Sequence, residues 1–209
     1  MKEHYIATTK TARYYTLGEL NDSTENVWIL LHGYAQLAKE FIVHFEELNN
    51  GKNFIIAPEG LNRFYSKGFS GKPVATWMTS EDRLNEINDY VHYLDRIYEE
   101  LAIGNKKVKT ILLGFSQGVA TASRWLHFTN NHIDHFVIYA GEMGAEILSP
   151  LSGKIKNIPL TYVTGNQDPL ITRESHLKVF ELMQSLQATI IEFEGGHEVR
   201  ADVIRRIVL

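Results

Sequence analysis

The stretch that most constrains the fold is residues 108–123, which read VKTILLGFSQGVATAS. The apolar run at 111–113 predicts a buried strand, and the small and apolar residues after Gly118 predict a packed helix. The pattern G-x-S-x-G, carried by Gly114, Ser116 and Gly118, joins the two. In a sharp turn from strand to helix, the positions two before and two after the serine need small residues because the elements nearly touch. The stretch therefore predicts a serine hydroxyl held at the carboxyl end of a strand and in front of a helix N-terminus.

Length and composition set broad limits. The chain has 209 residues, 44% of them hydrophobic, and a formal net charge of −4. We expect one domain over residues 1–209. Without a basic run there is no electrostatic case for binding nucleic acid, and no apolar run is long enough to span a membrane. The amino end lacks a signal-peptide pattern, and the chain has no cysteine, which together favour a cytoplasmic location.

Apolar runs of strand length alternate with segments of helical periodicity. This alternation predicts an α/β fold, with a mostly parallel central sheet and helices on both faces. A short antiparallel hairpin is expected at a sheet edge, over residues 4–7 and 13–17. Strands are expected at residues 27–31, 54–57, 111–113, 136–140, 160–164 and 189–193, and helices at 37–48, 84–101, after 118, at 172–186 and at the carboxyl end.

Residues 59–79 are the longest stretch without a regular pattern, and they carry several aromatic side chains. Loops of this length in compact domains are often functional, so we expect this one to govern access to a site. Thr79 and Asp82 at its end resemble a capping box that opens the next helix.

Three polar residues follow separate predicted strands. Ser116 follows one strand, Asp168 follows another and His197 follows the last. Carboxyl ends of parallel strands share one edge of the sheet, where functional groups gather. The chain order Ser, Asp, His is that of the α/β-hydrolase arrangement.

Each of these residues suits a role in acyl transfer. A serine hydroxyl is a poor nucleophile, so the His197 imidazole would take its proton, and Asp168 would orient that imidazole. The backbone N–H groups of Gln117 and Tyr34 are the expected donors to the oxyanion. His32, which also ends a strand, is expected to be structural because it precedes the serine strand.

Other readings of these residues stay open. Glu192 and Glu194 are rival acids because they are close to His197 in sequence, but a residue that near would have to fold back on its own loop. Asp168 could instead be a turn residue ahead of Pro169.

With these residues in place, the chain resembles the phospholipase/carboxylesterase family of α/β-hydrolases, which includes acyl-protein thioesterases. The motifs are LHGY at 31–34, GFSQG at 114–118, TGNQD at 164–168 and GH at 196–197. The resemblance implies that Ser116, Asp168 and His197 form a triad and that the Tyr34 and Gln117 amides form the oxyanion hole. It also implies a place for Trp77 in the loop near the acyl site, although packing alone would explain this tryptophan equally well.

Two positions depart from the family pattern. Ala35 stands where glycine is common, and Glu142 follows Gly141 where an aromatic residue is common. The first could narrow the oxyanion loop, and the second affects the shape of the acyl pocket. The connection from Gly141 to Ile158 is too short for a large cap domain.

The sequence thus leads us to expect a serine hydrolase, of the carboxylesterase type, that cleaves esters or thioesters through an acyl-enzyme without a cofactor or metal. The expected partner is a small-molecule ester with an apolar acyl part, bound with help from Trp77, Met78 and Met143. A peptidase or lactonase using the same triad is an alternative. A protein that keeps the fold only to bind a ligand is another. The sequence leaves the oligomeric state open.

Overall fold

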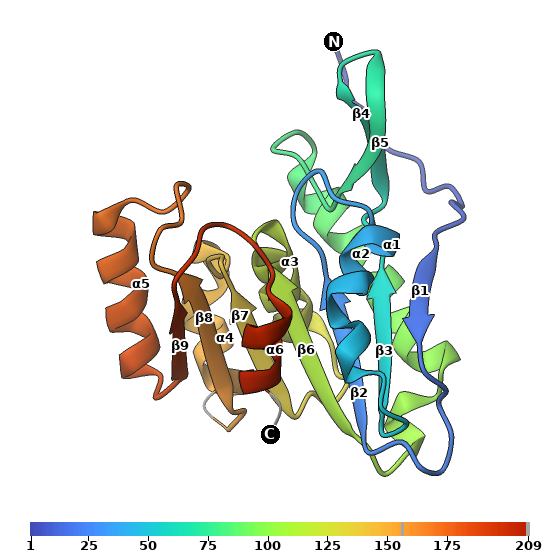
Figure 1. Ribbon diagram of the computed structural model, residues 1–209. Coiled ribbons are helices and arrows are strands. Elements are labelled where there is room, and N and C mark those ends of the chain that lie inside the picture. Colours follow the sequence, from blue (N-terminus) through green and yellow to red (C-terminus); the bar gives the residue numbers. More distant parts are fainter. Residues whose placement is uncertain (156, 208–209) are drawn as a thin grey trace.

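The computed structural model describes residues 1–155 and 157–207. Its centre is a seven-stranded sheet in the order β1-β3-β2-β6-β7-β8-β9 (Figure 1). Neighbouring strands are parallel, except that β1 is antiparallel to β3. The strands are β1 (Tyr14–Leu17), β2 (Asn26–Leu31), β3 (Asn53–Pro58), β6 (Lys109–Phe115), β7 (His135–Tyr139), β8 (Leu160–Gly165) and β9 (Thr189–Phe193). The predicted mostly parallel α/β sheet is therefore confirmed.

Helices cover both faces of this sheet (Figure 1). The helices are α1 (Ala38–Phe41), α2 (Arg83–Glu100), α3 (Gln117–Phe128), α4 (Leu148–Ile155), α5 (Arg173–Ser185) and α6 (Ala201–Ile207), with 3-10 helices η1 (Ile42–Leu48), η2 (Ile103–Asn105) and η3 (Ala145–Ile147). In the described part of the connection after β7, the only helices are η3 and α4, so these residues form no large cap domain. Among the described residues, no helix has both the length and the apolar character to cross a bilayer.

Strand β2 shows why its sequence suits the centre of the sheet. Successive side chains of a strand point to opposite faces, so an apolar run is stable only where both faces are covered. Val27 and Ile29 pack in the core that contains α2 and α3, whereas Trp28 and Leu30 pack in the core that contains α1 and α6. Each of these four side chains is buried.

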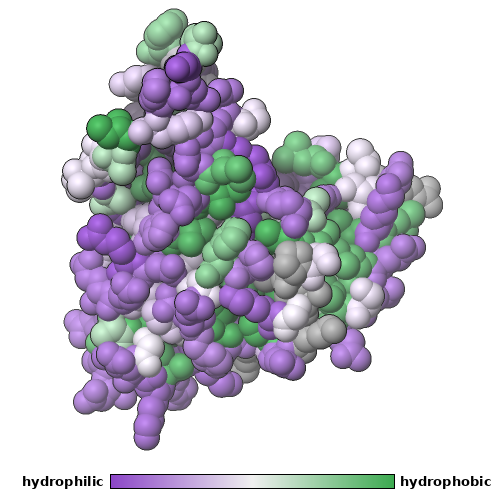
Figure 2. Space-filling model, turned by 180° about the vertical axis from the view of Figure 1, so that it is seen from behind, coloured by the Kyte–Doolittle hydropathy of each residue, from purple (hydrophilic) through white to green (hydrophobic). Residues whose placement is uncertain are grey.

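Residues 59–79, expected to be an irregular loop, instead contain an antiparallel hairpin of β4 (Asn62–Lys67) and β5 (Ser70–Thr76). The hairpin projects from the body of the molecule (Figures 1 and 2). Most side chains of β4 are exposed, so this strand lacks the apolar pattern that would reveal it in the sequence. Gly68, with a φ of 63°, provides the left-handed backbone that the tight turn requires.

Three smaller expectations were wrong. Residues 4–7 form no strand, so β1 meets the sheet without a hairpin partner before it. The helix expected at 37–48 is one turn of α1 followed by η1. Thr79 and Asp82 form no capping box, because the Thr79 N–H donates to Glu86 Oε2 over 2.6 Å and Asp82 has a φ of 48°.

Candidate active site

Ser116 lies in the turn between β6 and α3, with a φ of 52° and a ψ of −120°. Non-glycine residues rarely adopt this backbone, and its presence at a turn from strand to helix is typical of a nucleophile elbow. The flanking glycines permit it: a Cβ on Gly114 would lie 2.5 Å from the Gly118 oxygen, and one on Gly118 only 2.0 Å from the Leu31 oxygen. The turn therefore holds the Ser116 side chain, which is partly exposed, at the carboxyl edge of the sheet.

Asp168 and His197 come together from the loops after β8 and β9. His197 Nδ1 lies 2.6 Å from Asp168 Oδ2, and the Asp168 side chain is only 1% exposed. The Leu170 N–H donates to the other carboxylate oxygen over 2.9 Å, and the Gln167 N–H joins the two loops by donating to the Gly195 oxygen. Because a carboxylate only accepts, His197 donates from Nδ1, and its Nε2 is left to accept a proton.

The same edge of the sheet holds the His197 ring and the serine turn. The ring centroid of His197 lies 5.0 Å from that of Phe115, the residue before Ser116. In the part of the chain that the structure describes, the Ser116 hydroxyl makes no hydrogen bond. The rival acids Glu192 and Glu194 are exposed, and neither is paired with His197. The geometry thus favours Asp168 as the acid that orients this histidine.

The loop after β2 lies directly against the serine turn. A Cβ on Gly33 would lie 3.2 Å from the Ser116 Cβ. The Gly33 N–H donates to the side-chain oxygen Oε1 of Gln36 over 2.7 Å. The backbone oxygen of Gln36 accepts from the Ala75 N–H, which links this loop to β5. Ala35 has a φ of 57°, a left-handed backbone that costs an alanine about 1 kcal/mol relative to glycine. Having alanine in place of glycine at position 35 therefore adds backbone strain to this loop.

Tyr34 in this loop has an exposed side chain whose ring lies 5.4 Å from that of Phe64 in the hairpin. Its backbone N–H makes no hydrogen bond within the described residues, so it is available to an acceptor from outside.

His32 is fully buried and uses both ring nitrogens. Nδ1 lies 2.7 Å from the Gly33 oxygen, and Nε2 accepts from the Gly60 N–H over 3.0 Å. Burial lowers the pKa of His32 to about 4, so the ring is neutral near pH 7. As expected from the sequence, this histidine is structural.

The buried His32 predicts loss of stability in mild acid. His32 has its ordinary pKa of 6.5 in the unfolded chain and a pKa of about 4 in the folded protein. Between pH 4 and pH 6.5 the unfolded state therefore binds more protons than the folded state. The free energy of unfolding should therefore fall as the pH drops from 6.5 to 4, by about 3 kcal/mol from this group. Urea unfolding across this window should show a shallower pH dependence for His32→Gln than for the wild type. Parallel pH curves for the two proteins would contradict this explanation.

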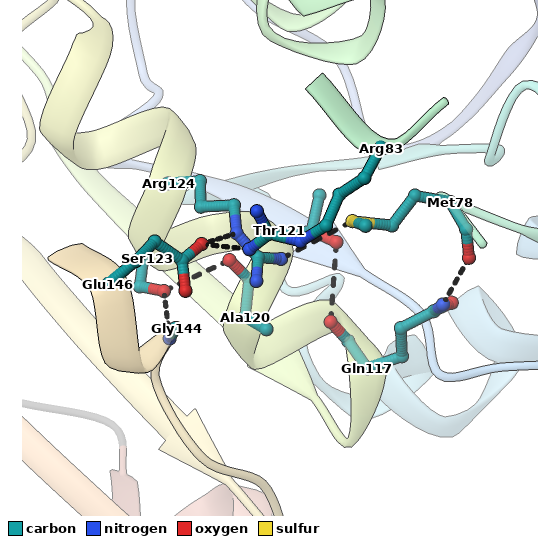
Figure 3. A network of polar contacts seen from close by, with 9 residues as sticks. All are labelled: Met78, Arg83, Gln117, Ala120, Thr121, Ser123, Arg124, Gly144 and Glu146. Carbon is teal, nitrogen blue, oxygen red and sulfur yellow. Dashed lines mark hydrogen bonds and ion pairs between the residues drawn. The ribbon is translucent and has the colours of Figure 1, made fainter. Parts of the chain in front are cut away.

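A polar network beside the serine turn is not evident from the sequence (Figure 3). The Gln117 side chain donates to the Met78 oxygen over 3.0 Å. Further along α3, Arg124 contacts Met78 Sδ and donates to Glu146 Oε1, which also accepts from Arg83. Burial opposes ionisation of Glu146, but the two arginines outweigh it and lower its pKa to about 2. The network therefore joins α3 to the segments that follow β5 and β7.

The three residues expected to bind substrate differ in their surroundings. Trp77 is 1% exposed and Met143 is 7% exposed, so both lie within the core. Met78 is partly buried. A cavity of about 580 Å³ lies between residues 8–14 and α2. Of the three residues expected to bind substrate, only Trp77 lines this cavity, and none of Ser116, Asp168 and His197 does.

Among the described residues, no group of three histidine or acidic side chains could hold a metal ion.

Comparison with known proteins identifies the family and the fold of the chain. The model of the family "Serine hydrolase (FSH1)" matches residues 24–202. No curated protein matches the chain. Three solved structures share its fold. Acyl-protein thioesterase 2 from Zea mays has 16% sequence identity and a TM-score of 0.70, with 94% of this chain and 96% of that chain covered. Esterase PE8 has 17% identity and a TM-score of 0.71 (95% of this chain and 96% of that chain covered), and a phospholipase/carboxylesterase from Dyadobacter fermentans has 16% identity and a TM-score of 0.64 (96% of each chain covered).

These matches confirm the resemblance to small α/β-hydrolase esterases that the motifs indicated. The family match covers the serine turn as well as the strand ends that carry Asp168 and His197. The chain belongs to the FSH1 family of serine hydrolases.

Proposed function

We propose that this protein hydrolyses carboxylic esters or thioesters through an acyl-enzyme, with Ser116 as nucleophile, His197 as general base and Asp168 as the residue that orients His197. The observation that carries the proposal is the hydrogen-bonded pair of His197 and Asp168 at the edge of the sheet where Ser116 occupies its strained turn. Membership of a serine hydrolase family and the esterase folds of similar structures agree with it.

In the proposed reaction, His197 Nε2 takes the proton of Ser116 Oγ as that oxygen attacks the substrate carbonyl carbon. The developing oxyanion accepts hydrogen bonds from two backbone N–H groups. One belongs to Gln117, at the N-terminus of α3, and the other to Tyr34, in the loop after β2. When the intermediate collapses, the alcohol or thiol leaves with the proton from His197. Water, deprotonated by His197, then attacks the acyl-enzyme, and the acid leaves as Ser116 regains its proton.

The lack of a hydrogen bond from Ser116 is compatible with this role. In unliganded enzymes the contact between nucleophile and base is often long and tightens only when substrate binds. The apolar groups next to the site, Tyr34 with Phe64 and the partly buried Met78, favour an ester with an apolar acyl part.

Covalent labelling tests the proposal. A fluorophosphonate probe should modify the protein once per chain, and peptide mass spectrometry should place the adduct on Ser116. The variant His197→Ala should label at least about a hundredfold more slowly, because it lacks the base that activates the hydroxyl. A folded wild-type protein that is not labelled, or is labelled at another serine, would overturn the proposed nucleophile.

A further inference from the structure

Trp77 makes a directed hydrogen bond to the loop that precedes the proposed oxyanion donor. Its indole N–H donates to the His32 oxygen over 2.8 Å, and both residues are buried. That oxygen belongs to the residue that follows β2, two residues before Tyr34. The two rings also pack together, with centroids 5.1 Å apart. Because Trp77 is 1% exposed, it has almost no surface to offer a substrate.

The backbone around Trp77 is in turn held by the side chain of Gln117, the residue after the proposed nucleophile. The Thr76 hydroxyl, which carries one hydrogen, lies 2.9 Å from Gln117 Oε1 and 3.1 Å from the Met78 oxygen, and Gln117 Oε1 also accepts from the Trp77 N–H over 3.3 Å. Gln117 Nε2 donates to the Met78 oxygen over 3.0 Å. Figure 3 shows this side chain reaching from the start of α3 toward Met78. The Gln117 side chain thus contacts three consecutive residues: Thr76, the last residue of β5, and the two residues that follow it, Trp77 and Met78.

These bonds form a continuous path between the two proposed oxyanion donors. The path begins at Gln117, passes through Thr76 and Trp77 to the His32 oxygen, and ends at the loop that carries Tyr34. A second tie runs from Gln36 to Ala75, on the same strand as Thr76. Oxyanion stabilisation requires donors at fixed positions, and a displacement of about 1 Å can cost a large part of the rate.

We infer that Trp77 and the Gln117 side chain are positioning residues, which set the spacing between the Tyr34 and Gln117 amides through the His32 oxygen. The inference rests on the proposed function, because it assigns these residues to the same oxyanion hole. It gives Trp77 control of donor geometry, in place of the substrate contact or simple packing expected from the sequence.

The decisive comparison is Trp77→Phe against Trp125→Phe. Both replacements keep an aromatic ring and remove a buried indole N–H. The indole N–H of Trp125 donates to Asp95 Oδ1 over 2.8 Å, and this hydrogen bond does not involve the serine turn. We expect comparable falls in thermal stability for the two variants. Only Trp77→Phe should lower kcat toward a p-nitrophenyl ester, by about tenfold, with KM within about twofold. Its affinity for an alkyl boronic acid, which forms a tetrahedral adduct on the serine, should fall by a similar factor.

Thr76 provides a second test that does not alter the core ring. Thr76→Val removes the hydroxyl that contacts Gln117 Oε1 and the Met78 oxygen, and Thr76→Ser retains it. The valine variant should lose about fivefold in kcat and in boronic acid affinity, and the serine variant should stay near wild type.

The outcomes distinguish failure of the inference about Trp77 and Gln117 from failure of the proposed function. An active wild type, with Trp77→Phe equal to Trp125→Phe in kcat and boronic acid affinity and Thr76→Val equal to Thr76→Ser, would overturn the inference and leave the proposed function intact. A wild type that neither turns over esters nor binds the boronic acid would instead overturn the proposed function.

Discussion

Replacing Asp168 with asparagine is expected to lower kcat by about 10⁴-fold while leaving the protein folded. The carboxylate now accepts from His197 Nδ1 over 2.6 Å. An asparagine of the same shape can present its NH₂ group to that nitrogen, which moves the imidazole proton to Nε2. A protonated Nε2 cannot take the proton of Ser116, so the base is lost even though the side chains stay in place.

The chain offers a matched control in a second acid and histidine pair. His132 Nε2 lies 3.0 Å from Asp134 Oδ1 on the surface, so Asp134→Asn removes a similar contact outside the candidate site. This variant should keep kcat within about twofold. A loss of less than about tenfold for Asp168→Asn, measured at equal folded fraction by circular dichroism, would argue against Asp168 as the residue that orients the base.

Much of the scaffold could be predicted because its signals are local. The run at residues 27–31 and most of the parallel strands after it are buried along nearly their whole length, as central parallel strands must be. Ser116, Asp168 and His197 could be proposed from the sequence because Ser116 directly follows β6 and the other two lie three and four residues after β8 and β9, whose carboxyl ends share one edge of the parallel sheet.

The missed features depend on contacts between distant segments. The hairpin of β4 and β5 was hidden because its exposed strands need no apolar alternation. The bonds from the Gln117 side chain join residues about 40 positions apart, and no local pattern predicts them. Trp77 illustrates the same limit, since an aromatic residue near a site could be a substrate contact or a core residue until its neighbours are known.

Removing the proposed nucleophile should lower activity by a factor similar in size to that expected for Asp168→Asn. Ser116→Ala deletes only the hydroxyl, so the turn, both proposed oxyanion amides and the pair of His197 and Asp168 should remain. Ester hydrolysis should fall by at least about 10³-fold, with a residual rate from the oxyanion donors acting on bound substrate and water. Because this hydroxyl makes no hydrogen bond in the described structure, the free energy of unfolding should change by less than about 0.5 kcal/mol.

The most direct test of the proposed serine esterase is the hydrolysis of p-nitrophenyl esters of increasing acyl length by the wild type and Ser116→Ala, purified side by side. Circular dichroism would establish that the two proteins are equally folded. We predict turnover by the wild type on at least one ester of the series and a loss of at least about 10³-fold in the variant on that ester. Equal hydrolysis by both proteins, or none by a folded wild type, would contradict the account.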